Sequence, residues 1–396
     1  MIKLPEKQEI LNRIENLYNA LNEKSIAWDA AFIVDKVNQY YFTGTMQDGV
    51  FILKKDGTYA YCVRNSYERA KKESPLDNIY PMVSYRDAAN IVGADIHSAY
   101  IETEVMTYVM YERLKKYFAL DEVMALDRII LNLRAVKSQY ELSCMEESGN
   151  QHKQLLENVV LDIFKEGINE AEFTATMYEK MVKLGYHGVT RFAMFQTELV
   201  VGQIAFGENS LYPTNFDGPG GMKGMSPAVP MVGDRNRGLK KGDLVFIDIG
   251  YGFNGYHTDR TQIYMYGKNP PDDVVKIHRQ CIEIQNKTAN LLKSGNIPAD
   301  IYNSVMGSLD DEFLKNFMGY GNRKVKFIGH GVGLHIDEIP LIANGFNEPL
   351  KENMTIAVEP KKGIANVGMV GVEDTYIVTE HGGKCITGGE KDIIVV

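Results

Sequence analysis

The segment LVFIDIGYGFNGYHTDRTQIYMY, residues 244–266, decides the fold of this chain. It predicts two apolar strands, 244–250 and 256–266, joined by an Asn-Gly step that suits a hairpin turn. An acidic residue interrupts each strand, Asp248 in the first and Asp259 in the second. A turn centred on Phe253-Asn254 places the two carboxylates opposite each other, where Cβ atoms lie about 4.5–5.5 Å apart. Two charges that close repel each other unless a cation lies between them.

A second pair of strands repeats this arrangement near the C-terminus. The strands are predicted at 354–359 (MTIAVE) and 369–378 (MVGVEDTYIV), and they carry Glu359 and Glu373 symmetrically about Asn366. An unpaired charge inside an apolar strand costs several kcal/mol. The four acidic residues are therefore better explained by a metal site than by solvated surface charges.

A histidine completes the candidate ligand set. His330 lies in FIGHGVGLHIDEIP, residues 327–340, where flanking glycines leave room for close backbone approach. Four carboxylates and one imidazole form a hard, anionic set that suits one or two divalent cations such as manganese, iron, cobalt or zinc.

The order D-x10-D, GHG, E-x13-E resembles the pita-bread metallopeptidase family, which includes prolidase, aminopeptidase P, methionine aminopeptidase and the metal-free creatinase. The region from Asp29 to Ala70 resembles the N-terminal domain shared by prolidase and creatinase. The resemblance implies an α/β (α+β) protein. A small creatinase-like α/β domain is expected at 1–132, and a pita-bread catalytic domain at 133–396. Helices are expected near the start of the chain, from Ile10 to Leu21, and from Ser138 onwards.

The resemblance also implies roles for individual residues. It makes Asp248, Asp259, His330, Glu359 and Glu373 the ligands of two divalent ions. Asp259 and Glu373 would bridge both ions, and Glu359 would also move protons between water and the leaving nitrogen. Manganese is the expected metal, with cobalt, iron or zinc as alternatives, and the family suggests a homodimer.

Three positions depart from the family pattern. Asp337 stands where the peptidases have a second histidine, and a histidine occurs two residues earlier, at His335. Met231 stands where a substrate-contacting histidine is usual, and Gly371 where prolidase-like members carry an arginine. These changes spare the ligands but alter the pocket. Either Asp337 is free to act as a base, or it is a surface acid and His335 takes the missing histidine's role.

Further pocket residues are suggested by position alone. His257 lies two residues before Asp259 and so shares its face of the strand. It is expected either to line the cleft and bind substrate or to pack in the core. Tyr212 lies in a segment that is expected to line the pocket.

Composition limits the remaining possibilities. The formal net charge of −9 argues against nucleic acid and against anionic membrane surfaces as partners. No apolar run reaches the roughly 18–20 residues of a membrane span. The first residues lack a signal-peptide core. The four cysteines are scattered without paired spacing, which fits reduced thiols in the cytoplasm.

The leading interpretation is a dinuclear metallohydrolase that resembles Xaa-Pro dipeptidases and aminopeptidases. It would cleave a small peptide or amide bond by attack of metal-bound hydroxide. The alternative is a hydrolase or lyase of another small molecule on the same fold, with Asp337 as the base. A third possibility is an inactive binding protein of the same fold.

Overall fold

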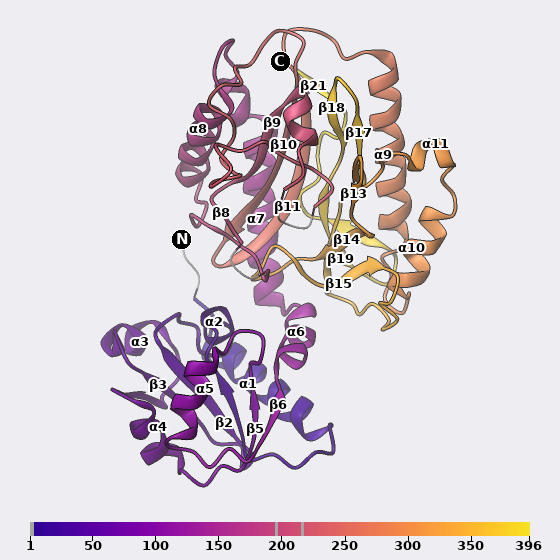
Figure 1. Ribbon diagram of the computed structural model, residues 1–396. Coiled ribbons are helices and arrows are strands. Elements are labelled where there is room, and N and C mark those ends of the chain that lie inside the picture. Colours follow the sequence, from indigo (N-terminus) through magenta and orange to yellow (C-terminus); the bar gives the residue numbers. More distant parts are fainter. Residues whose placement is uncertain (1–3, 195–196, 215–217) are drawn as a thin grey trace. The chain divides into compact units, whose positions relative to one another are not determined.

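The computed structural model describes residues 4–194, 197–214 and 218–396 and divides the chain into two compact units (Figure 1). Unit 1 is Met1–Arg134 and unit 2 is Ala135–Val396. Both units combine helices with sheets, so the protein has the mixed α/β class that the sequence predicts. Within the described residues, no helix combines the length and the apolar character needed to span a membrane.

Unit 1 is built on a six-stranded mixed sheet of order β4-β3-β2-β1-β5-β6. Its strands are β1 (Ala30–Ile33), β2 (Gly49–Lys54), β3 (Tyr59–Val63), β4 (Ile79–Pro81), β5 (Ser98–Ile101) and β6 (Glu122–Ala125). The helices of this part of the chain are α1 (Lys7–Asn22), α2 (Lys36–Thr43), α3 (Tyr67–Glu73), α4 (Tyr85–Val92), α5 (Tyr108–Lys115) and α6 (Asp127–Ala135). Helix α1 buries Ile10, Ile14, Leu17 and Leu21, which recur at the predicted helical spacing.

Unit 2 contains the residues predicted to bind metal. Its larger sheets have the orders β21-β11-β10-β9 and β15-β14-β16-β19-β20. The strands of the first are β9 (Gly202–Phe206), β10 (Leu244–Phe253), β11 (Tyr256–Met265) and β21 (Ile394–Val395). Those of the second are β14 (Phe327–Gly331), β15 (Glu338–Ala343), β16 (Thr355–Val358), β19 (Asp374–Val378) and β20 (Gly383–Cys385). Shorter pairs are formed by β7 (Thr190–Arg191) with β8 (Glu198–Leu199), β12 (Gly319–Tyr320) with β13 (Arg323–Lys324), and β17 (Lys361–Ile364) with β18 (Gly368–Gly371).

Two long helices of unit 2 pack on the ligand-bearing strands. The helices of this unit are α7 (Gln139–Glu157), α8 (Glu170–Lys183), α9 (Asp272–Leu291), α10 (Pro298–Met306) and α11 (Asp311–Leu314), with short 3₁₀ helices at Val159–Ile163 and Gly207–Leu211. Helix α7 begins after Ser138, which forms a capping box with Glu141. It contacts β10 and β11, whereas α9 contacts β16, β17, β18 and β20 (Figure 1). Each hairpin is thus backed by its own helix.

The register of the first hairpin differs from the prediction. Strands β10 and β11 pair Phe253 with Tyr256, so the turn consists of Asn254 and Gly255. Their φ angles of 51° and 89° are the left-handed pair that a two-residue type I′ turn requires. This turn is centred one residue later than predicted.

The corrected register changes the neighbours of both aspartates. Asp248 lies opposite Thr261, and Asp259 lies opposite Gly250. The two carboxylates are therefore diagonal neighbours on one face of the hairpin rather than a directly opposed pair.

The second hairpin keeps the predicted register but is interrupted. Strands β16 and β19 pair Val358 with Asp374, and β17 and β18 pair Lys361 with Gly371. Both ladders are symmetric about Asn366, as the sequence predicts. Pro360 lies in the gap and has no backbone N–H to donate, which is consistent with a break in the ladder at this point.

Gly255 gives a direct test of the turn. Replacing Gly255 by alanine should lower the free energy of unfolding by about 1–2 kcal/mol, because a Cβ is disfavoured at positive φ. Gly255→Asn should cost less, since asparagine tolerates the left-handed region. Urea denaturation of the two variants measures this difference. An alanine variant as stable as the asparagine variant would contradict the assigned turn.

Candidate metal centre

The five predicted ligands line one pocket of unit 2. Asp248 and Asp259 come from β10 and β11, and His330 comes from β14. Glu359 directly follows β16 and Glu373 directly precedes β19. Residues separated by up to 125 positions in the sequence are thus brought together by two hairpins and a neighbouring strand.

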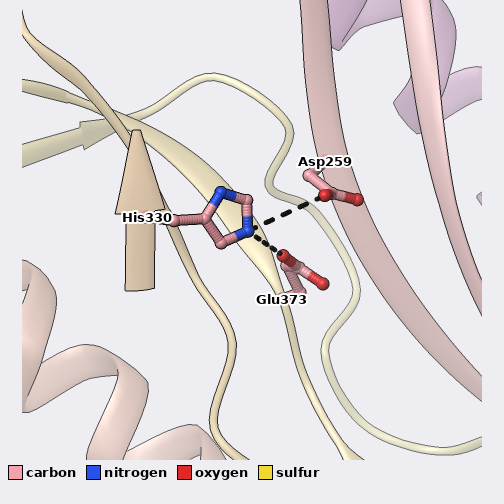
Figure 2. Close-up of side chains that lie close together, drawn as sticks. All are labelled: Asp259, His330 and Glu373. Atoms are coloured by element: carbon pink, nitrogen blue, oxygen red, sulfur yellow. Dashed lines mark ion pairs between the residues drawn. The ribbon is translucent and has the colours of Figure 1, made fainter. Parts of the chain in front are cut away.

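The ring of His330 is oriented toward the carboxylates. Its Nδ1 lies 3.0 Å from the carbonyl oxygen of Gly331, so this nitrogen can donate its hydrogen to the backbone. Its Nε2 lies 3.6 Å from Oε1 of Glu359 and 3.6 Å from Oε1 of Glu373. The same nitrogen lies 3.9 Å from Oδ2 of Asp259, and Figure 2 shows the ring of His330 facing both Asp259 and Glu373.

These atoms fit a divalent cation. Ligand atoms of Asp259, His330 and Glu373 all lie within 4.8 Å of one another. Oε1 of Glu359 and Oε1 of Glu373 are buried and have no hydrogen-bond partner in the described part of the chain. Buried carboxylate oxygens are expensive to leave unpaired, and a metal with bonds of about 2.0–2.2 Å would satisfy them.

Hydroxyl groups hold the carboxylate-bearing strands together. Thr261, opposite Asp248, donates its hydroxyl to Oε2 of Glu373 at 3.0 Å. Thr375 accepts from the backbone N–H of Asp259 at 2.8 Å and donates to its carbonyl oxygen at 3.0 Å. The sequence analysis did not identify either threonine, although each lies two residues from a predicted ligand and so shares its face.

Lys361 is a further residue that the sequence analysis missed. Its Nζ lies 3.0 Å from Oδ2 of Asp248, 2.7 Å from Oε2 of Glu359 and 2.6 Å from Oε2 of Glu373. The lysine is fully buried. Burial by itself lowers the pKa of a lysine, but the charges of the three carboxylates raise the pKa of Lys361 well above its usual value. A lysine two residues after Glu359 on an extended segment was the available signal, since both side chains then point to one face.

Burial and the neighbouring charges set the protonation of the carboxylates. Burial raises the pKa of Asp248 to about 6 and that of Glu359 to about 7, although Lys361 acts in the opposite direction on both. Burial also acts to raise the pKa of Glu373, but Lys361 and His330 outweigh it and the pKa is lowered. Burial and the charge of Glu373 together raise the pKa of Asp259 well above its usual value.

Asp337 also lines the pocket. Its Oδ1 accepts a hydrogen bond from the backbone N–H of Ala193 at 2.8 Å. Burial raises its pKa to about 6, against the opposing effect of that hydrogen bond. Phe192, Leu199 and Ile336 supply apolar lining nearby, and half-buried Met231 packs in the same cluster as Phe192 and Leu199.

The other predicted pocket residues lie elsewhere. His257 is fully buried, with Nδ1 3.1 Å from the carbonyl oxygen of Gly333 and Nε2 accepting from the backbone N–H of Arg191. It therefore joins β11 to strand β7 and to the loop at Gly333 in the interior, as in the core-packing alternative, and it is not among the described residues that line the pocket. His335 is half-buried and Tyr212 is half-exposed, and neither is among the described residues that line the pocket.

Comparison with known families assigns the chain to a protein family. Residues 143–380 match the model of metallopeptidase family M24, and residues 13–136 match the creatinase/prolidase N-terminal domain. The chain belongs to metallopeptidase family M24, which confirms the predicted resemblance to pita-bread prolidases. Membership of this family implies a site for divalent metal ions.

Relatives and solved structures agree with this assignment along the whole chain. The Xaa-Pro dipeptidase of Pyrococcus furiosus is 29% identical over 392 residues, which is 96% of this chain and 99% of that protein. The structure of prolidase from Pyrococcus furiosus has a TM-score of 0.74 at 26% identity and covers 94% of this chain and 99% of its own. An Xaa-Pro dipeptidase from Bacillus anthracis shares the fold, with a TM-score of 0.79 at 23% identity over 98% of this chain and all of its own.

The raised pKa of Asp337 predicts a specific pH dependence of stability. A carboxyl group whose pKa is higher in the folded than in the unfolded state makes folding less favourable as the pH rises through that interval. For Asp337 the interval runs from about 4 to about 6. Asp337→Asn does not titrate, so its stability relative to wild type should increase across this interval, by on the order of 1 kcal/mol per pKa unit.

Urea denaturation of wild type and Asp337→Asn at pH 4.5 and pH 7 measures this effect, because both proteins share every other titrating group. A difference in unfolding free energy that is the same at both pH values would contradict the raised pKa.

Proposed function

We propose that this protein is a metal-dependent peptidase that hydrolyses short peptides, with Xaa-Pro dipeptides as the first substrates to test. The observation that carries the proposal is the convergence of His330 Nε2 and Asp259 with two glutamate oxygens that have no hydrogen-bond partner among the described residues. The similarity to Xaa-Pro dipeptidases over nearly the whole chain supports it.

The residues of the pocket support a hydrolytic role. A divalent ion bound there would polarise the substrate carbonyl and lower the pKa of water. Glu359, a carboxylate that lines the pocket, would accept a proton from water and return it to the leaving nitrogen. The apolar wall at Phe192, Leu199 and Ile336 suits the ring of a proline or another apolar side chain.

The identity of the metal and the state of the protein form part of this proposal. Manganese is the proposed metal, with cobalt, iron and zinc as alternatives, because the oxygen-rich ligand set suits hard divalent ions. The proposed state is a cytoplasmic homodimer. The structure describes all four cysteines as free thiols, which is consistent with a reducing compartment.

A second candidate is a hydrolase or lyase of another small molecule. The observation that favours it is Asp337, an acidic group in the pocket whose raised pKa suits a general base. A screen with manganese decides between the two candidates by comparing Xaa-Pro dipeptides, longer peptides with N-terminal Xaa-Pro, and small amides or sulfonium compounds. Turnover of the last group alone would replace the peptidase assignment.

Removing the imidazole ligand should abolish function. His330→Ala is expected to reduce both metal affinity and turnover by on the order of 100-fold or more. Mutation of a residue that only hydrogen-bonds to a metal ligand already lowers metal affinity or activity by roughly 10–100-fold. The matched control is His97→Ala, which removes an exposed histidine of unit 1 paired with Asp95 and Asp121. Calorimetric titration with manganese and peptidase assays measure both effects. A His330→Ala protein with undiminished affinity would refute the assigned site.

A further inference from the structure

The ammonium group of Lys361 is fully coordinated by the predicted metal ligands. A lysine ammonium has three hydrogens to donate. In this site three carboxylate oxygens accept them, one each from Asp248, Glu359 and Glu373, at 3.0, 2.7 and 2.6 Å. Lys361 is completely buried, so no water competes for these hydrogens. The lysine therefore occupies a cation position among the carboxylates rather than approaching them from the edge.

The two glutamates divide their oxygens between two cation positions. Each directs Oε2 to Lys361 and Oε1 toward Nε2 of His330, at 3.6 Å in both cases. The two Oε1 atoms lack hydrogen-bond partners within the described residues, whereas the Oε2 atoms are satisfied by the ammonium. The position beside His330 is therefore lined by glutamate oxygens that lack hydrogen bonds, whereas the position at Lys361 already holds a positive charge.

The backbone opposite Lys361 is shaped to accommodate it. Gly371 is its cross-strand partner and has a φ of +135°. A Cβ at Gly371 would lie 2.3 Å from the carbonyl oxygen of Pro360, 2.6 Å from Cα of Lys361 and 3.1 Å from its Cγ. The arginine expected at this position from the family pattern is thus incompatible with the observed path of the Lys361 segment. Lys361 and the departure at Gly371 are thus two parts of one local arrangement.

We propose that Lys361 replaces one of two metal ions, and that this site binds a single divalent cation. His330, Asp259, Glu359 and Glu373 hold that cation, while Asp248 serves as the ion-pair partner of Lys361. A second divalent ion would need the three oxygens that the ammonium already occupies and would be repelled by its charge. This inference rests on the proposed metal-dependent function and concerns how many ions that function uses.

Metal stoichiometry tests the inference without reference to turnover. The full chain is equilibrated with excess manganese, freed of unbound metal by gel filtration and analysed by inductively coupled plasma mass spectrometry. Wild type should retain about one ion per chain. Lys361→Met should retain about two, because the neutral side chain neither donates to the three carboxylate oxygens nor repels a second cation beside Asp248. Adding Asp248→Ala to Lys361→Met should return the count to one. Lys361→Arg, which keeps the charge, should stay at one.

The neighbouring lysine gives a matched control. Lys362 directs its Nζ to the carbonyl oxygens of Phe313 and Lys315, away from the carboxylates. Lys362→Met removes a lysine from the same strand and should leave one bound ion. Circular dichroism establishes that each variant is folded, and the wild-type count remains decisive if a variant does not fold.

The outcomes separate this inference from the proposed function. Two ions in wild type would overturn the inference alone and leave the metal-dependent function intact. One ion in both wild type and folded Lys361→Met would show that Lys361 does not exclude the second ion, which also overturns the inference. No bound ion in wild type would overturn the proposed function and this inference with it.

Discussion

The four carboxylates of the predicted ligand set converge in one mostly buried pocket, and the arrangement of unit 2 depends on how their charge is balanced. Two unit charges 4 Å apart interact by about 4 kcal/mol at an effective dielectric constant of about 20, so four such groups cannot all be ionised without nearby cations. Lys361 supplies one positive charge from within the chain. Beside His330, two glutamate oxygens without a hydrogen-bond partner in the described part of the chain mark the position proposed for a further cation.

The two hairpins of unit 2 hold these carboxylates in place. The corrected register places Thr261 opposite Asp248, where its hydroxyl holds Glu373, and Thr375 fixes the backbone of Asp259. A break at Pro360 separates the two ladders of the second hairpin. Glu359 lines the pocket beside this break, and the buried Lys361 contacts its carboxylate. The site is therefore held by backbone pairing between distant segments. This pairing provides the rigidity that a preorganised ligand set requires.

The sequence was sufficient to predict the family and which residues come together in the pocket, but not how their charges are balanced. The five residues that line the pocket together are predictable because charged residues inside apolar strands are rare, and the second hairpin has the predicted register, with both ladders symmetric about Asn366. The prediction for the first hairpin is wrong by one residue. The turn is centred between Asn254 and Gly255, because these are the two residues with the left-handed φ values that the turn requires.

Lys361 shows why the charge balance of the site is not predictable from the sequence. Its spacing from Glu359 predicts that both side chains share a face, but its contacts with three carboxylates depend on the path of the backbone at Pro360 and Gly371, which spacing does not reveal. His257 illustrates the same limit: its position on strand β11 is predictable, but its partners are backbone groups of Gly333 and of Arg191 in β7, both distant in the sequence. Side chains that share a strand face can still lie at different depths within the protein.

The central claim is that the carboxylates bind one divalent cation beside His330 while Lys361 fills the other position. Anomalous X-ray diffraction from crystals grown with manganese tests it most directly, because the method locates each ion individually. The account predicts one anomalous peak within bonding distance of His330 Nε2 and none between Asp248 and Lys361. Peaks at both positions, or no peak beside His330, would contradict it.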